Sequence, residues 1–116
     1  MGGEPLKGIS PSEFKCRVEP FTTTQDLADA FAATSNEFWW VEDNEYDFEK
    51  ETEEYKRAVA LTDEWGALLD KYEEMIFEIL RGEGVEIPPT GRIVVLVPFM
   101  KRYGYDDMGG WWIKSE

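Results

Sequence analysis

Histidine is absent from the 116-residue sequence, and cysteine occurs once, at Cys16. Without histidine the chain cannot form Ser–His or Cys–His nucleophilic pairs, carry out imidazole acid–base catalysis or build the usual zinc sites. A single cysteine excludes an internal disulfide and is typical of a reducing compartment. These absences exclude the commonest catalytic mechanisms. An enzyme is still possible, because carboxylates, tyrosine, lysine and metal ions can also carry out catalysis.

Basic residues are also scarce. The chain has 12 Lys and Arg against 25 Asp and Glu, which gives a formal net charge of −13 at pH 7. Direct binding of nucleic acid or of an anionic membrane surface requires a cationic surface, so we expect neither. The negative charge favours cations, basic proteins or the nucleic-acid groove of another protein as partners.

Long hydrophobic runs are missing as well. No stretch approaches the roughly 18 apolar residues that span a bilayer, and the segment MGGEPLKGIS lacks the apolar core of a signal peptide. We therefore expect a cytoplasmic protein. Hydrophobic residues make up 42% of the chain, which is sufficient for one globular domain. This single domain is predicted over residues 13–116, preceded by a flexible tail over residues 1–12.

Residue patterning predicts an α+β fold. EFKCRVEPF alternates apolar and polar residues, IVVLV has the β-branched composition of a central strand, and GWWIKSE is predicted to be a closing strand. Helical periodicity predicts a short helix over about 24–35 and a long, acidic one over about 45–81, capped by Asn44 and stopped by Gly82. The expected order is β-α-α-β-β, a small antiparallel sheet of about three strands (13–20, 92–101 and 110–115) with two helices on one face.

The acidic charge is concentrated in residues 37–55, EFWWVEDNEYDFEKETEEY, which hold nine acidic residues, one lysine and six aromatic residues. On a helical wheel Asp47, Glu51 and Glu54 share the line that later carries apolar core residues such as Trp65. Burying these carboxylates without partners would cost several kcal/mol each. The first half of the predicted long helix must therefore project past the core, rotate away from it, or not be helical.

Three interpretations of this stretch stay open. It is the solvated end of a helix, or it is an interaction surface, or it binds a cation. If the stretch is an interaction surface, its carboxylates, spaced along a rigid helix, would imitate the phosphates of nucleic acid. They would enter a basic channel of another protein, and the aromatic side chains would act as anchors. A calcium loop counted from Asp43 has Phe48 where the sharp turn needs glycine. We expect no metal ion and no cofactor.

Two tryptophan pairs, Trp39–Trp40 and Trp111–Trp112, add to the candidate surface. Neighbouring side chains in a strand or turn point to opposite faces, so we expect one of each pair in the core and the other at the surface or beneath a loop. The candidate partner-binding residues combine the acidic stretch with one tryptophan of each pair: Asp43, Asp47, Phe48, Glu51, Glu54, Tyr55, Trp40 and Trp112.

These features predict a non-catalytic acidic binding protein that docks on a positively charged protein surface. By size and charge alone, it is of the general kind of nucleic-acid mimics, phage anti-defence inhibitors and immunity proteins. A carboxylate- or metal-dependent enzyme is one alternative, and it needs some of Glu37, Asp43, Asp47 and Glu51 to converge in a pocket. A self-associating structural protein that pairs an open strand edge is another. The sequence leaves the oligomeric state open.

Overall fold

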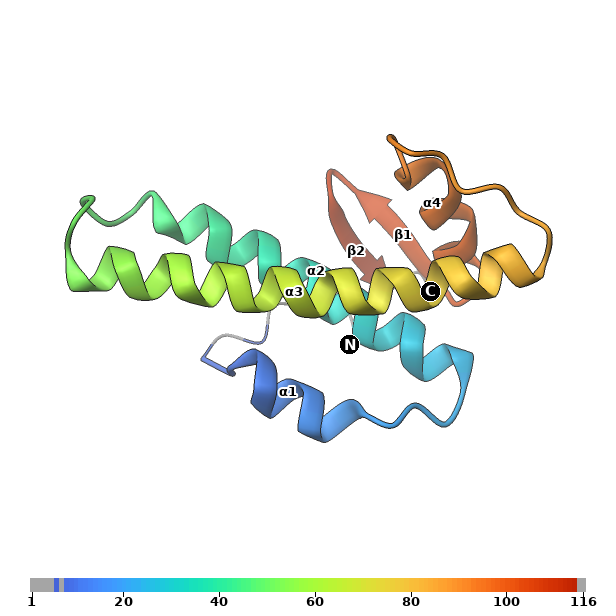
Figure 1. The fold of residues 1–116 in the computed structure, drawn as a ribbon, viewed down its shortest axis with the longest axis horizontal. Coiled ribbons are helices and arrows are strands. Elements are labelled where there is room, and N and C mark those ends of the chain that lie inside the picture. Colours follow the sequence, from blue (N-terminus) through green and yellow to red (C-terminus); the bar gives the residue numbers. More distant parts are fainter. Residues whose placement is uncertain (1–5, 7, 115–116) are drawn as a thin grey trace.

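The computed structural model describes residue 6 and residues 8–114. Within these residues the fold is α+β, with four helices and a two-stranded antiparallel sheet (Figure 1). The elements are α1 (Pro11–Val18), α2 (Thr24–Glu45), α3 (Glu53–Gly82), α4 (Ile93–Lys101), β1 (Tyr105–Met108) and β2 (Trp111–Lys114). The fold class is confirmed, whereas the predicted β-α-α-β-β order, with two helices and about three strands, is wrong.

The predicted tail over residues 1–12 falls partly on residues 1–5 and 7, which lie outside the described residues. Its last two residues, 11–12, already belong to α1. Of the predicted strand over residues 13–20, residues 13–18 form the rest of this helix, and residues 19–20 follow it. Ser10 caps it, since its Oγ accepts the Glu13 backbone N–H at 3.2 Å. Cys16, which a strand would have buried, is exposed, so the capping signal SPSE outweighs the short alternation that follows it.

Helices α2 and α3 pack side by side as an antiparallel hairpin that runs the length of the molecule (Figure 1). A capping box between Thr23 and Asp26 starts α2, which continues for 22 residues and so extends well past the predicted end near residue 35. Near the middle of α3, Gly66 faces Phe38 of α2, and a Cβ at Gly66 would lie 3.1 Å from the Phe38 ring. The missing side chain therefore allows the two helices to approach closely.

The apolar segment predicted as a central strand over residues 92–101 forms helix α4. Its buried residues, Leu96, Phe99 and Met100, follow helical spacing. Pro98 lies inside the helix on its exposed side. The carbonyl that a proline at this position leaves without its i+4 donor belongs to Val94, which is 66% exposed. Water can therefore replace the lost hydrogen bond, and β-branched composition alone does not make this segment a strand.

Strands β1 and β2 are joined by the two glycines Gly109 and Gly110, both with positive φ, as a tight hairpin turn requires. Strand β1 is absent from the expected order of elements. The predicted closing strand is confirmed over Trp111–Lys114. Met108 pairs with Trp111 in the register of the hairpin.

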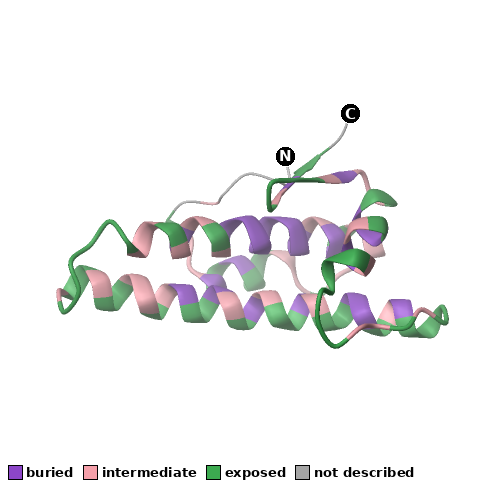
Figure 2. Ribbon diagram, turned by 90° about the horizontal axis from the view of Figure 1, so that it is seen from above, coloured by how far each residue is buried: buried purple, intermediate pink, exposed green. Residues whose placement is uncertain are grey.

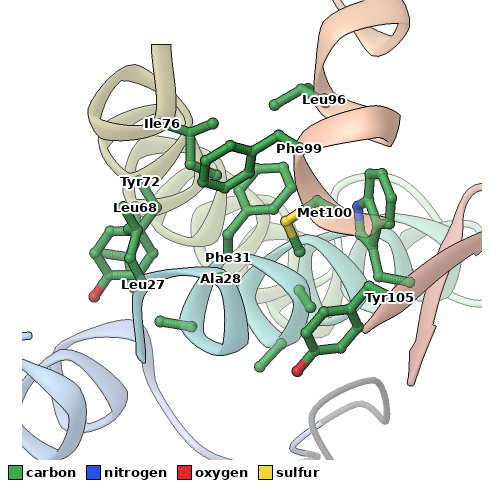
Figure 3. Close-up of a cluster of buried hydrophobic side chains, with 14 of the residues drawn as sticks. Leu27, Ala28, Phe31, Leu68, Tyr72, Ile76, Leu96, Phe99, Met100 and Tyr105 are labelled. Atoms are coloured by element: carbon green, nitrogen blue, oxygen red, sulfur yellow. The ribbon is translucent and has the colours of Figure 1, made fainter. Parts of the chain in front are cut away.

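The core forms where α4 and the β hairpin pack against α2 and α3 (Figure 3). Phe31 of α2 lies at its centre, with its ring centroid 5.9 Å from that of Trp112. Helix α1 packs on α3 elsewhere, and the rings of Phe14 and Trp65 lie 5.6 Å apart. The labelled core residues in Figure 3 come from both helices of the hairpin, from α4 and from β1: Leu27, Ala28, Phe31, Leu68, Tyr72, Ile76, Leu96, Phe99, Met100 and Tyr105.

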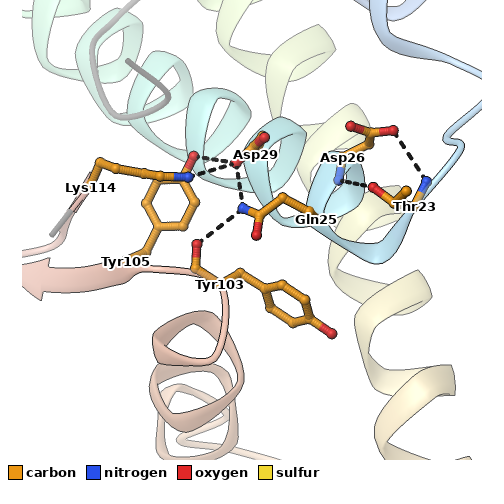
Figure 4. Close-up of polar contacts among 7 residues, drawn as sticks. All are labelled: Thr23, Gln25, Asp26, Asp29, Tyr103, Tyr105 and Lys114. Carbon is orange, nitrogen blue, oxygen red and sulfur yellow. Dashed lines mark hydrogen bonds and ion pairs between the residues drawn. The ribbon is translucent and has the colours of Figure 1, made fainter. Parts of the chain in front are cut away.

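Polar contacts fix the β hairpin to α2. The buried Asn36 donates from Nδ2 to the Trp112 carbonyl at 2.8 Å, and its Oδ1 accepts the Trp112 N–H at 2.9 Å. Towards the start of α2, Asp29 Oδ1 accepts hydrogen bonds from Tyr105 at 2.7 Å and from Gln25 at 3.0 Å (Figure 4). Burial, together with the hydrogen bond to Asp29, raises the pKa of the Tyr105 hydroxyl. These contacts position the C-terminal strands on α2 by hydrogen bonding as well as by apolar packing.

Glu19, just after α1, binds to α3. Lys71 Nζ donates to both of its carboxylate oxygens at 2.9 Å, and the Tyr72 hydroxyl donates to Oε2 at 2.8 Å. Burial acts to raise the pKa of Glu19, but the hydrogen bonds from Lys71 and Tyr72 and the Lys71 charge outweigh it and hold this pKa below its ordinary value of 4.5.

The lowered pKa of Glu19 makes its contribution to stability depend on pH. The contribution is present above the unfolded-state pKa and is lost as the pH falls through the folded-state pKa. We expect Glu19→Gln to lower the free energy of unfolding by about 1 kcal/mol at neutral pH. Urea unfolding across the acid range should show this difference shrinking as the pH falls. A difference that stays constant with pH would contradict this account, and Glu13→Gln on the exposed side of α1 is the control.

No helix in the described part of the chain is both long enough and apolar enough to cross a lipid bilayer.

Candidate functional site

The acidic stretch lies at the end of the α2–α3 hairpin, where the chain reverses direction. Residues 46–52 are not helical and connect α2 to α3. We call residues 43–55 the acidic tip. They comprise the last turn of α2, this connection and the first turn of α3. Figure 2 shows that most of this end of the molecule is exposed.

Local capping explains why the predicted continuous helix is broken here. Asn44 was expected to cap the long helix, but its Nδ2 donates to the Trp40 carbonyl at 2.6 Å within α2. The cap of α3 is Thr52, whose Oγ1 accepts the Tyr55 N–H at 3.1 Å. A reversal over residues 46–52 keeps Asp47 and Glu51 exposed to water. Of the three ways in which the sequence could avoid burying these carboxylates, the chain therefore adopts the non-helical one.

Glu51 adopts a left-handed backbone conformation, with φ of +74°. This conformation costs a non-glycine residue roughly 1–2 kcal/mol. Glycine would occupy the position without that cost. The connection therefore carries a carboxylate at a position where backbone conformation favours glycine.

The acidic tip holds seven carboxylates and one lysine. Most of the carboxylates are exposed (Asp43, Asp47, Glu49, Glu51, Glu53 and Glu54), and Glu45 is half-buried. Among the described residues, the tip contributes one ion pair, between Glu53 Oε1 and Lys56 Nζ at 3.7 Å, and both of its side chains are largely exposed. The fold thus leaves most of this negative charge without a basic side chain close enough to neutralise it.

A cleft of about 260 Å³ opens between α2 and α3 beside the acidic tip. Its apolar walls come from both helices and the connection, and Glu54 and Arg57 are its charged lining residues. Phe48 is 41% exposed and belongs to the lining, while Tyr46 is 82% exposed in the same connection. The walls consist of Trp40, Val41, Phe48, Ala58 and Leu61. An apolar cleft therefore adjoins a strongly negative surface.

The structure brings together seven of the eight residues chosen from the sequence. Asp43, Asp47, Phe48, Glu51, Glu54 and Tyr55 belong to the acidic tip, and Trp40 lines the adjacent cleft. Trp112 lies apart from them in β2 and is 3% exposed, because it packs on α2. Of the Trp39–Trp40 pair, Trp39 is the exposed member at 44%, and Trp40 is half-buried.

Sequence patterning overlooked Tyr46 and Arg57. On a continuous helix Tyr46 would have had no special exposure, and Arg57 would have been one of several surface charges. Because the chain reverses at residues 46–52, Tyr46 lies at the end of the hairpin and Arg57 lines the cleft. Tyr46 itself, an aromatic residue between Glu45 and Asp47, was the available signal, because aromatic residues are enriched in binding interfaces.

Of the four carboxylates that the enzyme alternative names, one is buried and three are exposed. Glu37 is 1% exposed within α2, and its Oε2 accepts the Leu6 backbone N–H. Asp43, Asp47 and Glu51 are exposed at the tip. Within residue 6 and residues 8–114, no three Asp, Glu, His or Cys side chains are grouped so that they could hold a metal ion.

The comparisons give no relative from which a function could be transferred. Family models, curated proteins and solved structures were all compared with this chain, and none matches it.

Proposed function

We propose that this protein is a non-catalytic binding protein whose acidic tip docks on a positively charged surface of another protein. The observation that carries the proposal is the combination found at the end of the hairpin. The acidic tip combines seven carboxylates with exposed aromatic side chains, and an apolar cleft adjoins it. Negative charge accelerates encounter with a basic surface, and an aromatic anchor supplies most of the binding energy of a typical interface.

The form of the tip supports a specific docking surface. A polar, solvating helix end would need no apolar cleft and no backbone cost at Glu51. Two long helices packed against each other hold the connection at a defined place, so the cost of ordering the surface on binding is reduced. The partner we propose has Lys and Arg side chains around an apolar side chain that enters the cleft. The basic surface of nucleic-acid machinery is one such partner, with the tip in place of nucleic acid.

The test compares two variants that change the net charge equally. Asp47/Glu51/Glu54→Gln removes three charges from the acidic tip, and Asp63/Glu64/Glu86→Gln removes three from exposed positions elsewhere. Binding partners are captured from host lysate at about 0.1 M and about 0.5 M salt, between which the screening length falls from about 10 Å to a few Å. The captured protein is then purified, and its Kd for each variant is measured.

We expect a basic partner that binds at the lower salt concentration and dissociates at the higher one. The tip variant should weaken binding by about a hundredfold, because three charge contacts are lost together. The control variant should change the Kd by less than about threefold, since it alters only the overall field. A Phe48→Ser variant should weaken binding at unchanged charge. Equal losses in both triple variants, or full binding by the tip variant, would refute docking through the tip, and displacement by duplex DNA would identify the partner surface as a nucleic-acid groove.

A further inference from the structure

A second cleft, of about 450 Å³, lies away from the acidic tip between α2, α3, the start of α4 and the β hairpin. Its size is within the range of small-molecule sites. Three aromatic and three aliphatic side chains form the apolar part of its walls. These are Phe31, Trp39 and Trp112, and Leu69, Ile93 and Leu96. A site lined in this way would bind the apolar body of a small organic molecule.

A few polar groups are also in the lining, as small-molecule sites require. Ser35, which is 5% exposed, contributes a hydroxyl group. Glu73 from α3 and Asp107 from β1 supply carboxylates.

The charge of the lining favours a cation. Glu73 and Asp107 are opposed by one guanidinium, that of Arg92, which lies 3.8 Å from Glu73 Oε1 and 5.3 Å from the centroid of the Phe77 ring. Burial and the charge of Asp70 raise the pKa of Glu73 despite Arg92. The lining therefore carries one more carboxylate than it has cations, and the face of the exposed Trp39 ring can attract an ammonium group.

We infer that this cleft binds a small organic ammonium ion, with its charge near Glu73 and Asp107 and its apolar body against the exposed side chains of Trp39 and Ile93. The site is independent of the acidic tip. An anion is the competing ligand, because α4 begins at the cleft beside Arg92 with no side chain capping its first turn.

The experiment titrates the intact protein with choline and follows the tryptophan indole N–H signals by ¹H–¹⁵N NMR. The Trp39 signal is assigned with a Trp39→Phe variant. The neutral control ligand is 3,3-dimethylbutan-1-ol, which has the shape of choline without its charge, and inorganic phosphate tests the anion. Glu73→Gln removes the negative charge, and Glu64→Gln, exposed on the same helix, is the matched control.

We expect choline to shift the Trp39 and Trp112 signals saturably and the neutral alcohol to bind at least about tenfold more weakly. Glu73→Gln should weaken choline binding by about tenfold, and Glu64→Gln should leave it unchanged. Equal binding of the alcohol, a response to phosphate instead, or no saturable shift with choline would each overturn the inference.

The pH dependence gives a second readout. Glu73 faces Asp70 and Glu74 on its own helix and Arg92 at the start of α4, and Asp107 from the β hairpin lines the same cleft. Choline affinity should fall as the pH is lowered through the raised Glu73 pKa, because protonation removes the attracting charge. Glu73→Gln should abolish most of this dependence, whereas a purely structural role of Glu73 would leave it in place.

Discussion

Replacing Phe99 with alanine is expected to lower the free energy of unfolding by about 3–5 kcal/mol. Phe99 is fully buried on α4, its ring centroid lies 5.1 Å from that of Tyr103, and the Arg102 guanidinium lies 5.6 Å from the ring centroid. The substitution leaves a cavity between α4 and the α2–α3 hairpin. Because single domains are stable by only about 5–15 kcal/mol, the loss is a large share of the total, and urea unfolding would measure it.

Val94→Ala is the matched control for Phe99→Ala. Val94 is on the same helix and is 66% exposed, so its truncation should change stability by no more than about 0.5 kcal/mol. If the two variants destabilise the protein equally, α4 does not pack through Phe99. The comparison therefore also tests whether residues 93–101 form a docked helix rather than the strand predicted from their composition.

Asn36→Ala is expected to destabilise the protein by about 2–4 kcal/mol, although it removes few atoms. Its amide satisfies both the N–H and the carbonyl of Trp112, which are buried. Without it, two buried backbone groups lose their partner, and each unsatisfied group costs about 1–3 kcal/mol. Amide hydrogen exchange at Trp112 should accelerate along with the loss of global stability.

Asn44→Ala serves as the control for Asn36→Ala, since Asn44 is also on α2 and its amide bonds within its own helix, to the Trp40 carbonyl. Its replacement should cost less than about 1 kcal/mol. Unchanged exchange at Trp112 in Asn36→Ala, or equal destabilisation by the two variants, would show that the paired hydrogen bonds do not hold the β hairpin on α2.

Much of the long helix could be predicted from the sequence. Trp65, Leu68, Tyr72, Ile76 and Leu80 recur at helical spacing and are all buried in α3. The helix ends at Gly82, the glycine that was predicted to stop it. Long periodic segments are predictable because many side chains report the same period.

The short segments were mispredicted for the opposite reason. Residues 13–20 and 92–101 each carry features of both strand and helix, and a few residues cannot decide between the two periods. In the fold, the helical arrangement directs Phe14 against Trp65 and Phe99 into the core. Tertiary packing therefore overrides the β propensity of the β-branched run IVVLV over residues 93–97.

For the candidate site too, some features could be predicted from the sequence and others could not. The sequence by itself determined the net charge of −13, the absence of histidine chemistry and the concentration of carboxylates in residues 37–55, because these depend only on which residues occur and in what order. Only the tertiary structure decided that the acidic stretch is the reversal of a helical hairpin, that an apolar cleft adjoins it and that Trp112 is buried. The physical reason is that burial and clefts arise from contacts between segments far apart in the chain, and local periodicity carries no information about those contacts.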